Sequence, residues 1–192
     1  MEKNNRIKVL AFAGSNSKRS INLKLVKYAL SYLEYGEVNL LDLNDYEVAL
    51  YSIDREKNDG YPEKIKSFIS QIKQCDCMVI SLAEHNGSYS VAFKNIFDWA
   101  SVIDCNFFQN KPMFLMSTSI DGFAGEDVMD AAESYFPQYG ANIEQTYSLP
   151  RFYDDFDETN GIINNELKSD FERKIGLFKE KLNYLFTKRS LD

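Results

Sequence analysis

The chain has 192 residues, of which 44% are hydrophobic and 27% are charged, and its formal net charge is −7. This length and composition are typical of a soluble globular protein, so we expect one domain over residues 1–192. The acidic balance argues against nucleic acid as the main partner.

The apolar runs and the cysteines exclude several further classes. Residues 1–8 are polar and charged, and only a strand-length apolar run follows them, unlike a signal or transit peptide. No apolar run approaches the roughly 18 residues that a membrane helix needs, so no membrane partner is expected. Cys75, Cys77 and Cys105 are odd in number and lack zinc-site spacing, which predicts reduced thiols in a cytoplasmic protein.

The first predicted element is a strand over residues 7–13. Its apolar run has no polar alternation, as in a strand covered by helices on both faces. A turn rich in Gly, Ser and Asn follows over residues 14–22, and a helix over 21–35 would end at Gly36. The turn is either a simple helix cap or a phosphate site, since helix N-termini offer unpaired N–H groups. Four apolar residues predict the buried face of this helix: Leu23, Val26, Leu30 and Leu33.

Strands and helices alternate through the rest of the chain. Further strands are predicted over residues 38–43, 77–83, 112–117 and 141–147. Further helices are predicted to begin at Pro62 and to cover residues 91–103, 126–139 and 163–186. The segments 44–60 and 148–161 are predicted to be loops. The acidic cluster in 148–161 lacks the glycine of a calcium loop, so we expect a solvated loop and no metal site.

This alternation predicts an α/β fold with a parallel sheet and helices on both faces. The economical topology is a doubly wound five-stranded sheet of order 2-1-3-4-5, with its ligand crevice at the carboxyl ends of the strands. Three strand-to-helix loops at that edge carry small and hydrogen-bonding residues: 14–22, 84–90 and 117–125.

Each of these loops matches a known motif. Residues 14–22 read GSNSKRSIN and resemble G-S-x-R-x-x-S-x-N. Residues 83–88 and 93–99 read AEHNGS and FKNIFDW, and they resemble P-E-Y-N-G-S followed by L-K-N-x-x-D-W. Residues 111–125 resemble the pattern K-P-…-S-T-S-…-G-…-G. The chain thus resembles, over roughly residues 7–150, the NADPH-dependent FMN reductases of the flavodoxin-like superfamily, which include quinone, azo-dye and chromate reductases.

The resemblance implies a flavodoxin-like fold that binds FMN and uses NAD(P)H. The FMN phosphate would be held by Ser15, Ser17, Ser20 and Asn22. The isoalloxazine edge would lie along Glu84, His85, Asn86 and Gly87. The ribityl chain and the other side of the ring would be bordered by Ser117, Thr118, Ser119 and Gly122. The family's loop arginine is Ser17 here, so Lys18 or Arg19 would supply the positive charge, and the family's Pro and Tyr are Ala83 and His85.

The implied activity is FMN-dependent oxidation of NAD(P)H with reduction of a quinone, flavin, azo compound or similar small acceptor. Hydride transfer would pass through flavin N5, without an obligatory catalytic acid or base from the protein. The family also implies a homodimer or homotetramer. The alternatives are a flavodoxin-like electron carrier, whose usual T-x-T-G-x-T loop is absent, and a non-catalytic FMN-binding or regulatory protein.

Overall fold

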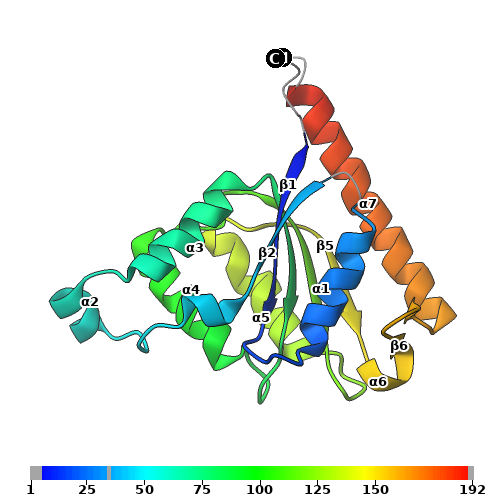
Figure 1. The fold of residues 1–192 in the computed structure, drawn as a ribbon, viewed down its shortest axis with the longest axis horizontal. Helices are drawn as coiled ribbons and strands as arrows, with labels where there is room; N and C mark the ends of the chain where they lie inside the picture. The colour runs from blue at the N-terminus through cyan, green and yellow to red at the C-terminus, as the bar shows by residue number, and fades with distance from the viewer. Residues whose placement is uncertain (1–5, 34–35, 190–192) are drawn as a thin grey trace.

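The computed structural model describes residues 6–33 and 36–189, and a five-stranded parallel sheet forms its centre (Figure 1). The strand order is β2-β1-β3-β4-β5, which confirms the predicted topology. The strands are β1 (Ile7–Gly14), β2 (Gly36–Leu41), β3 (Cys77–Leu82), β4 (Pro112–Thr118) and β5 (Asn142–Leu149). All five carboxyl ends point to the lower edge of Figure 1, so the loops that follow them share one rim.

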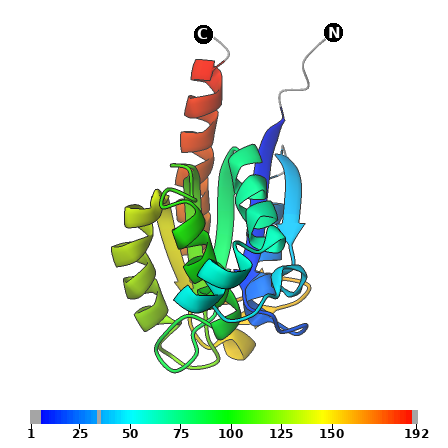
Figure 2. The same ribbon diagram turned by 90° about the vertical axis from the view of Figure 1, so that its left-hand side faces the viewer.

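Helices cover both faces of the sheet (Figures 1 and 2). One face packs against α3 (Glu63–Gln74), α4 (Val91–Ile103) and α5 (Glu126–Tyr135). The other face packs against α1 (Ile21–Ser31) and α7 (Asn165–Arg189). Successive residues of β1 therefore face different cores: Leu10 and Phe12 face the first set of helices, and Val9 and Ala11 face the second. This explains the continuous apolar runs, because each side of a strand needs apolar side chains.

Two segments predicted to be loops contain regular structure. Segment 44–60 includes the 3₁₀ helix η1 (Leu43–Tyr46) and α2 (Ile53–Asp59), which Ser52 caps by accepting from the N–H of Arg55. Segment 148–161 includes three short elements: α6 (Phe152–Asp155), β6 (Phe156–Asp157) and β7 (Gly161–Ile162), of which β6 and β7 pair as a small antiparallel sheet. The prediction of structureless loops is therefore wrong there.

Some predicted boundaries also differ. Helix α1 ends at Ser31 and Gly36 is the first residue of β2, so Gly36 is not the stop of that helix. Residues 34–35 lie outside the described part. Helix α5 ends at Tyr135 and continues as the 3₁₀ helix η2 (Phe136–Tyr139). No helix in the described residues is long and apolar enough to cross a membrane.

The three cysteines differ in accessibility. Cys75, at the end of α3, and Cys77, the first residue of β3, are buried, whereas Cys105 is exposed. Burial raises the pKa of the Cys75 thiol to about 11 and also raises the pKa of Cys77. Because the thiolate is the reactive form, we expect an aromatic disulfide reagent at pH 8 to modify one thiol per native chain. Cys105→Ser should remove that reaction; rapid labelling of a second thiol before unfolding would contradict the prediction.

Candidate functional site: three loops at one rim

The three predicted loops meet at the carboxyl edge of the sheet. The Ser90 hydroxyl, at the start of α4, donates to the carbonyl oxygen of Gly14 at the end of β1, at 2.7 Å. The Glu84 carboxylate accepts from the N–H of Val128 in the first turn of α5, at 3.1 Å. The structure thus joins loop 1 (residues 14–22) to loop 2 (84–90), and loop 2 to the helix that follows loop 3 (117–125).

Asn22, in loop 1, connects this loop to loop 3 through buried hydrogen bonds. Its side chain is only 3% exposed. The amide oxygen accepts from the Ser81 hydroxyl at 2.7 Å and from the N–H of Thr118 at 3.2 Å, and the amide nitrogen donates to the carbonyl oxygen of Thr118 at 3.3 Å. One side chain therefore connects α1 with the ends of β3 and β4. The family resemblance implies that Asn22 binds the FMN phosphate, and that role stays a prediction beside this structural one.

Loop 1 presents polar groups at the N-terminus of α1. Ser15 is half-buried, whereas Ser17, Lys18 and Arg19 are exposed. The Ser20 hydroxyl caps the helix by accepting from the N–H of Leu23, at 3.1 Å. Within the described residues, neither Lys18 nor Arg19 has a carboxylate partner. Two uncompensated cations at a helix N-terminus favour an anionic ligand, although the chain as a whole is acidic.

Loop 2 is a tight hairpin. The backbone groups of His85 and Ser88 exchange hydrogen bonds of 2.8 and 3.2 Å, and Glu84 pairs with Tyr89. Asn86 and Gly87 at its tip both have positive φ, 54° and 71°, as the type I′ hairpin turn requires. Asn and Gly adopt this conformation at low cost, so the sequence specifies the turn locally.

The loop 2 hairpin contacts the first turn of α5. Besides the Glu84 contact, the Asp127 carboxylate lies where a side chain on Gly87 would begin, 3.2 Å from an ideal Cβ. Glu84 was predicted to lie along the isoalloxazine edge of the flavin. In the structure its carboxylate accepts from the N–H of Val128 at the N-terminus of α5, where the helix dipole favours negative charge. A direct contact of Glu84 with a ligand stays a prediction.

Side chains of loop 3 fall into buried and exposed groups. Ser117 and Thr118 are almost fully buried, and their hydroxyls donate to the carbonyl oxygens of Ala124 and Leu149, at 2.5 and 2.8 Å. Ser119 is half-buried and donates to the Asp121 carboxylate at 2.7 Å, and Gly122 is exposed. The buried pair therefore holds the loop, and the exposed part of loop 3 begins at Ser119.

The chain after β5 fixes loop 3 from the far side. The N–H groups of Arg151 and Phe152 donate to the carbonyl oxygens of Asp121 and Ser119, at 2.7 and 2.9 Å. The Arg151 side chain forms an ion pair of 2.9 Å with the buried Asp155. Part of the acidic cluster thus supports the rim, and the described residues contain no group of three or more His, Cys, Asp or Glu arranged to hold a metal ion.

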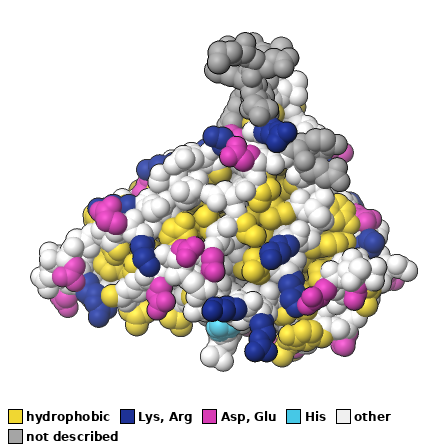
Figure 3. Space-filling view, in the orientation of Figure 1, with side chains coloured by type: hydrophobic (Ala, Val, Ile, Leu, Met, Phe, Trp, Pro, Cys, Tyr) yellow, Lys and Arg dark blue, Asp and Glu magenta, His cyan; other side chains and the backbone are white. Residues whose placement is uncertain are grey.

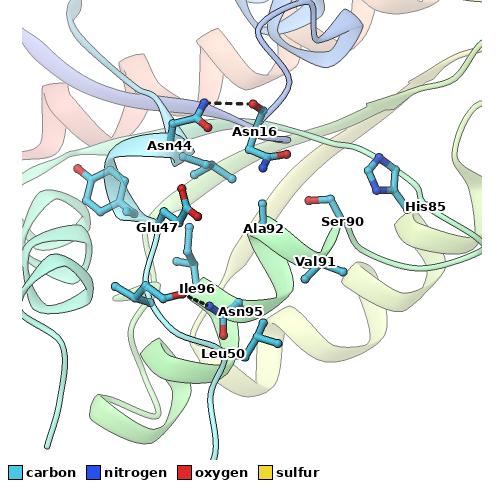
Figure 4. A pocket seen from close by; sticks show the side chains of 13 residues that line it. Asn16, Asn44, Glu47, Leu50, His85, Ser90, Val91, Ala92, Asn95 and Ile96 are labelled. Atoms are coloured by element: carbon cyan, nitrogen blue, oxygen red, sulfur yellow. Dashed lines mark hydrogen bonds between the residues drawn. The ribbon is translucent and has the colours of Figure 1, made fainter. Parts of the chain in front are cut away.

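Sequence reasoning missed one wall of the site. A cavity of about 240 Å³ opens between loop 1, segment 43–50, loop 2 and the first turns of α4 (Figure 4). Asn16 and His85 bring loops 1 and 2 to this cavity, and loop 3 does not line it. His85 lies at the lower edge of the molecular surface beside Lys or Arg side chains (Figure 3). Segment 43–50 carries no recognisable motif, so its part in the site could not be predicted from the sequence.

The chain matches a known family over most of its length. A family model described as NADPH-dependent FMN reductase matches residues 7–152, which include all three loops. The chain belongs to this family. The resemblance inferred from the loop motifs is therefore confirmed, and the family consists of oxidoreductases that use NAD(P)H and FMN.

Individual proteins and one solved structure are similar to this chain. An uncharacterized protein from Mycoplasma pneumoniae is 31% identical over 153 residues, 74% of this chain and 87% of that protein. An NADPH:quinone oxidoreductase from Arabidopsis thaliana is 30% identical over 62% of this chain and 61% of the plant protein. The flavoenzyme NAD(P)H:(acceptor) oxidoreductase FerB from Paracoccus denitrificans superposes with a TM-score of 0.69, over 93% of this chain and 98% of FerB. At 20% identity, the FerB match shows a common fold.

Proposed function

We propose that this FMN reductase family member is an FMN-dependent NAD(P)H oxidoreductase that reduces small acceptors such as quinones, flavins or azo compounds. The observation that carries the proposal is the joining of the three family motifs at one rim through Ser90, Glu84 and Asn22. Bound FMN would supply the redox chemistry, accepting a hydride from NAD(P)H at N5 and passing the electrons to the acceptor.

The donors at the rim fit a phosphorylated flavin. The phosphate needs positive charge and short hydrogen-bond donors, and the exposed part of loop 1 offers Ser17, Lys18 and Arg19 at the N-terminus of α1. We assign the phosphate to this loop, with Ser15, Ser20 and Asn22 completing it. A flat ring needs close approach of backbone, which the Asn86–Gly87 tip of the hairpin permits because Gly87 has no side chain.

The remaining predicted residues complete the proposed FMN site. Glu84 holds the hairpin against α5 and His85 lines the cavity beside α4, while Ser119 and Gly122 form the exposed part of loop 3. Ser117 and Thr118 keep that loop in place from inside the fold. A homodimer or homotetramer is part of the proposal, and it is supported by three exposed apolar side chains near loop 3: Ile120, Phe123 and Tyr153, which are 68%, 73% and 71% exposed.

The central test is the colour of the purified protein. After incubation with FMN and removal of free flavin, the protein should remain yellow, and NADPH or NADH should bleach it under anaerobic conditions. Bleaching by dithionite alone would identify an electron carrier and contradict the reductase assignment. A colourless protein that FMN does not reconstitute would contradict FMN binding altogether.

Charge removal in loop 1 tests the phosphate assignment. The double variant Lys18→Ala with Arg19→Ala should weaken FMN binding at least about tenfold, because each charge-assisted hydrogen bond contributes roughly 1.5–3 kcal/mol. Fluorescence titration of FMN measures the dissociation constant. The matched control is Lys24→Ala with Lys27→Ala, which removes the same charge from within α1, outside loop 1, and should bind FMN nearly as the parent does. Equal affinities of the two double variants would reject the assignment.

A further inference from the structure

The cavity beside α4 combines an apolar floor with polar side chains on its walls. Leu43 and Ile96 form the floor and are 3% and 2% exposed, and the methyl group of Ala92 projects from α4. Val91 and Leu50 stand at the mouth, 68% and 60% exposed. A volume of about 240 Å³ is below the usual range for drug-sized ligands and suits one ring or two fused rings.

The cavity walls are held in place without a ligand. The Asn95 amide of α4 donates to the carbonyl oxygens of Val48 and Ala49, at 3.1 and 3.3 Å, and its oxygen accepts from the N–H of Tyr51 at 2.9 Å. The Trp99 indole N–H also donates to the carbonyl oxygen of Ala49, at 2.9 Å. Segment 43–50 is therefore fixed against α4, and the cavity is preformed, which lowers the entropy cost of binding.

One acidic group faces into this space. Figure 4 shows Glu47, Asn16 and Ala92 pointing toward one another from three different elements. Within the described residues, the Glu47 carboxylate has no ion-pair or hydrogen-bond partner. The Asn44 amide donates to the carbonyl oxygen of Asn16, at 3.1 Å, so loop 1 and the Glu47 wall are joined directly. An occupant of the cavity would thus touch both the loop assigned to the flavin phosphate and an uncompensated negative charge.

We propose that the α4 cavity binds the aromatic ring of the electron acceptor, and that Glu47 selects neutral acceptors over anionic ones. This inference rests on the proposed function, since the acceptor must receive electrons from a flavin held by loops 1 and 2. Loops 1 and 2 line the cavity through Asn16 and His85, which places its occupant beside those loops. Glu47 repels a sulfonate or carboxylate on the ring, because two like charges at short range in a partly enclosed site disfavour each other.

The charge test compares 1,4-naphthoquinone with its 2-sulfonate. In the FMN-loaded protein, Glu47→Gln should raise the ratio of kcat/KM for the sulfonate to kcat/KM for the neutral quinone about fivefold. Asp45→Asn is the matched control. It removes an equal charge two residues away, outside the cavity lining, and should leave the ratio at the parent value. An unchanged ratio in Glu47→Gln, or an equal rise in Asp45→Asn, would overturn the selection by Glu47.

The second test fills the cavity. Ala92→Phe should slow the oxidation of dithionite-reduced flavin by naphthoquinone at least about tenfold, while the FMN dissociation constant stays within twofold of the parent. Reduction by dithionite separates this test from the use of NAD(P)H. If the parent protein binds no FMN, the proposed function fails; if Ala92→Phe binds FMN but reacts with the quinone at the parent rate, only the cavity assignment fails.

A binding measurement needs no turnover. The only tryptophan of the chain, Trp99, is bonded to the cavity wall, so naphthoquinone in the cavity should quench its fluorescence in the oxidised, FMN-loaded protein. The quenching should saturate in the parent protein and shift to at least about tenfold higher quinone concentration in Ala92→Phe. Identical titrations for the two proteins would show that the quinone binds elsewhere.

Discussion

Asn22→Ala is expected to lower the free energy of unfolding by about 3 kcal/mol and the melting temperature by roughly 10 °C. The substitution leaves the Ser81 hydroxyl and both backbone groups of Thr118 without their buried partner. Unpaired buried polar groups each cost about 1–3 kcal/mol, and only part of that cost is recovered by local rearrangement. Urea denaturation followed by circular dichroism measures the change.

Two further measurements distinguish the loss of the Asn22 hydrogen bonds between loops 1 and 3 from a general loss of stability. Ser81→Ala removes one of the three hydrogen bonds and should cost clearly less than Asn22→Ala. Because Asn22 joins loops 1 and 3, Asn22→Ala should also weaken FMN binding under conditions where the variant is still folded. A variant with parent-like stability would show that the buried hydrogen-bond network is dispensable.

Gly161→Ala is expected to destabilise the protein by about 3 kcal/mol, since it combines a strained backbone with a steric clash. Gly161 has a φ of 72°, and a Cβ there would lie 2.0 Å from Cε2 of Tyr28. The Tyr28 ring packs against the rings of Phe156 and Phe171, and its hydroxyl forms a hydrogen bond of 2.9 Å with the hydroxyl of Tyr32. Tyr28 therefore has little freedom to turn aside. Thermal unfolding of the variant measures the loss.

A second glycine provides the control. Gly176 lies within α7, and a Cβ there meets no atom within 4 Å. Gly176→Ala should leave stability unchanged or raise it by up to about 1 kcal/mol, because alanine has the higher helix propensity. Tyr28→Ala combined with Gly161→Ala should be less destabilised than the sum of the two single changes. Full additivity would mean that the clash with Tyr28 is relieved in some other way.

The sequence predicted the elements whose signal is local. Helix α4 has the predicted bounds, because Ser90 caps its start and its apolar stripe is regular. Helix α2 was missed, since none of its residues is buried and its sequence has no apolar face. The buried residues of α1 are Asn22, Leu25, Val26 and Ala29. Of the predicted residues Leu23, Val26, Leu30 and Leu33, Val26 and Leu33 are buried, and Leu33 lies just beyond the end of the helix. A buried asparagine shifts the face, and only its tertiary partners explain that position.

The same division applies to the site. Loop composition and the shared edge of a parallel sheet placed the three loops together, which the hydrogen bonds between them confirm. The contacts that could not be predicted are those between residues distant along the chain. Asn95 and Trp99 belong to the motif over residues 93–99, and the structure shows that both hold the main chain of segment 48–51. No local sequence pattern in segment 48–51 predicts these contacts.

The position of β1 inside the sheet has a consequence for how the chain matures on the ribosome. Val9 pairs with Cys77 as well as with Val38, so the first strand to be synthesised stays bare on one edge until the third has emerged. Its Val9 side is covered finally by α7, the last helix of the fold. Pairings between distant segments form slowly. We therefore expect the nascent chain to expose an unpaired strand edge and an apolar strand face through much of translation. Such a chain is prone to aggregate, and we expect it to depend on chaperones until α7 packs against the sheet.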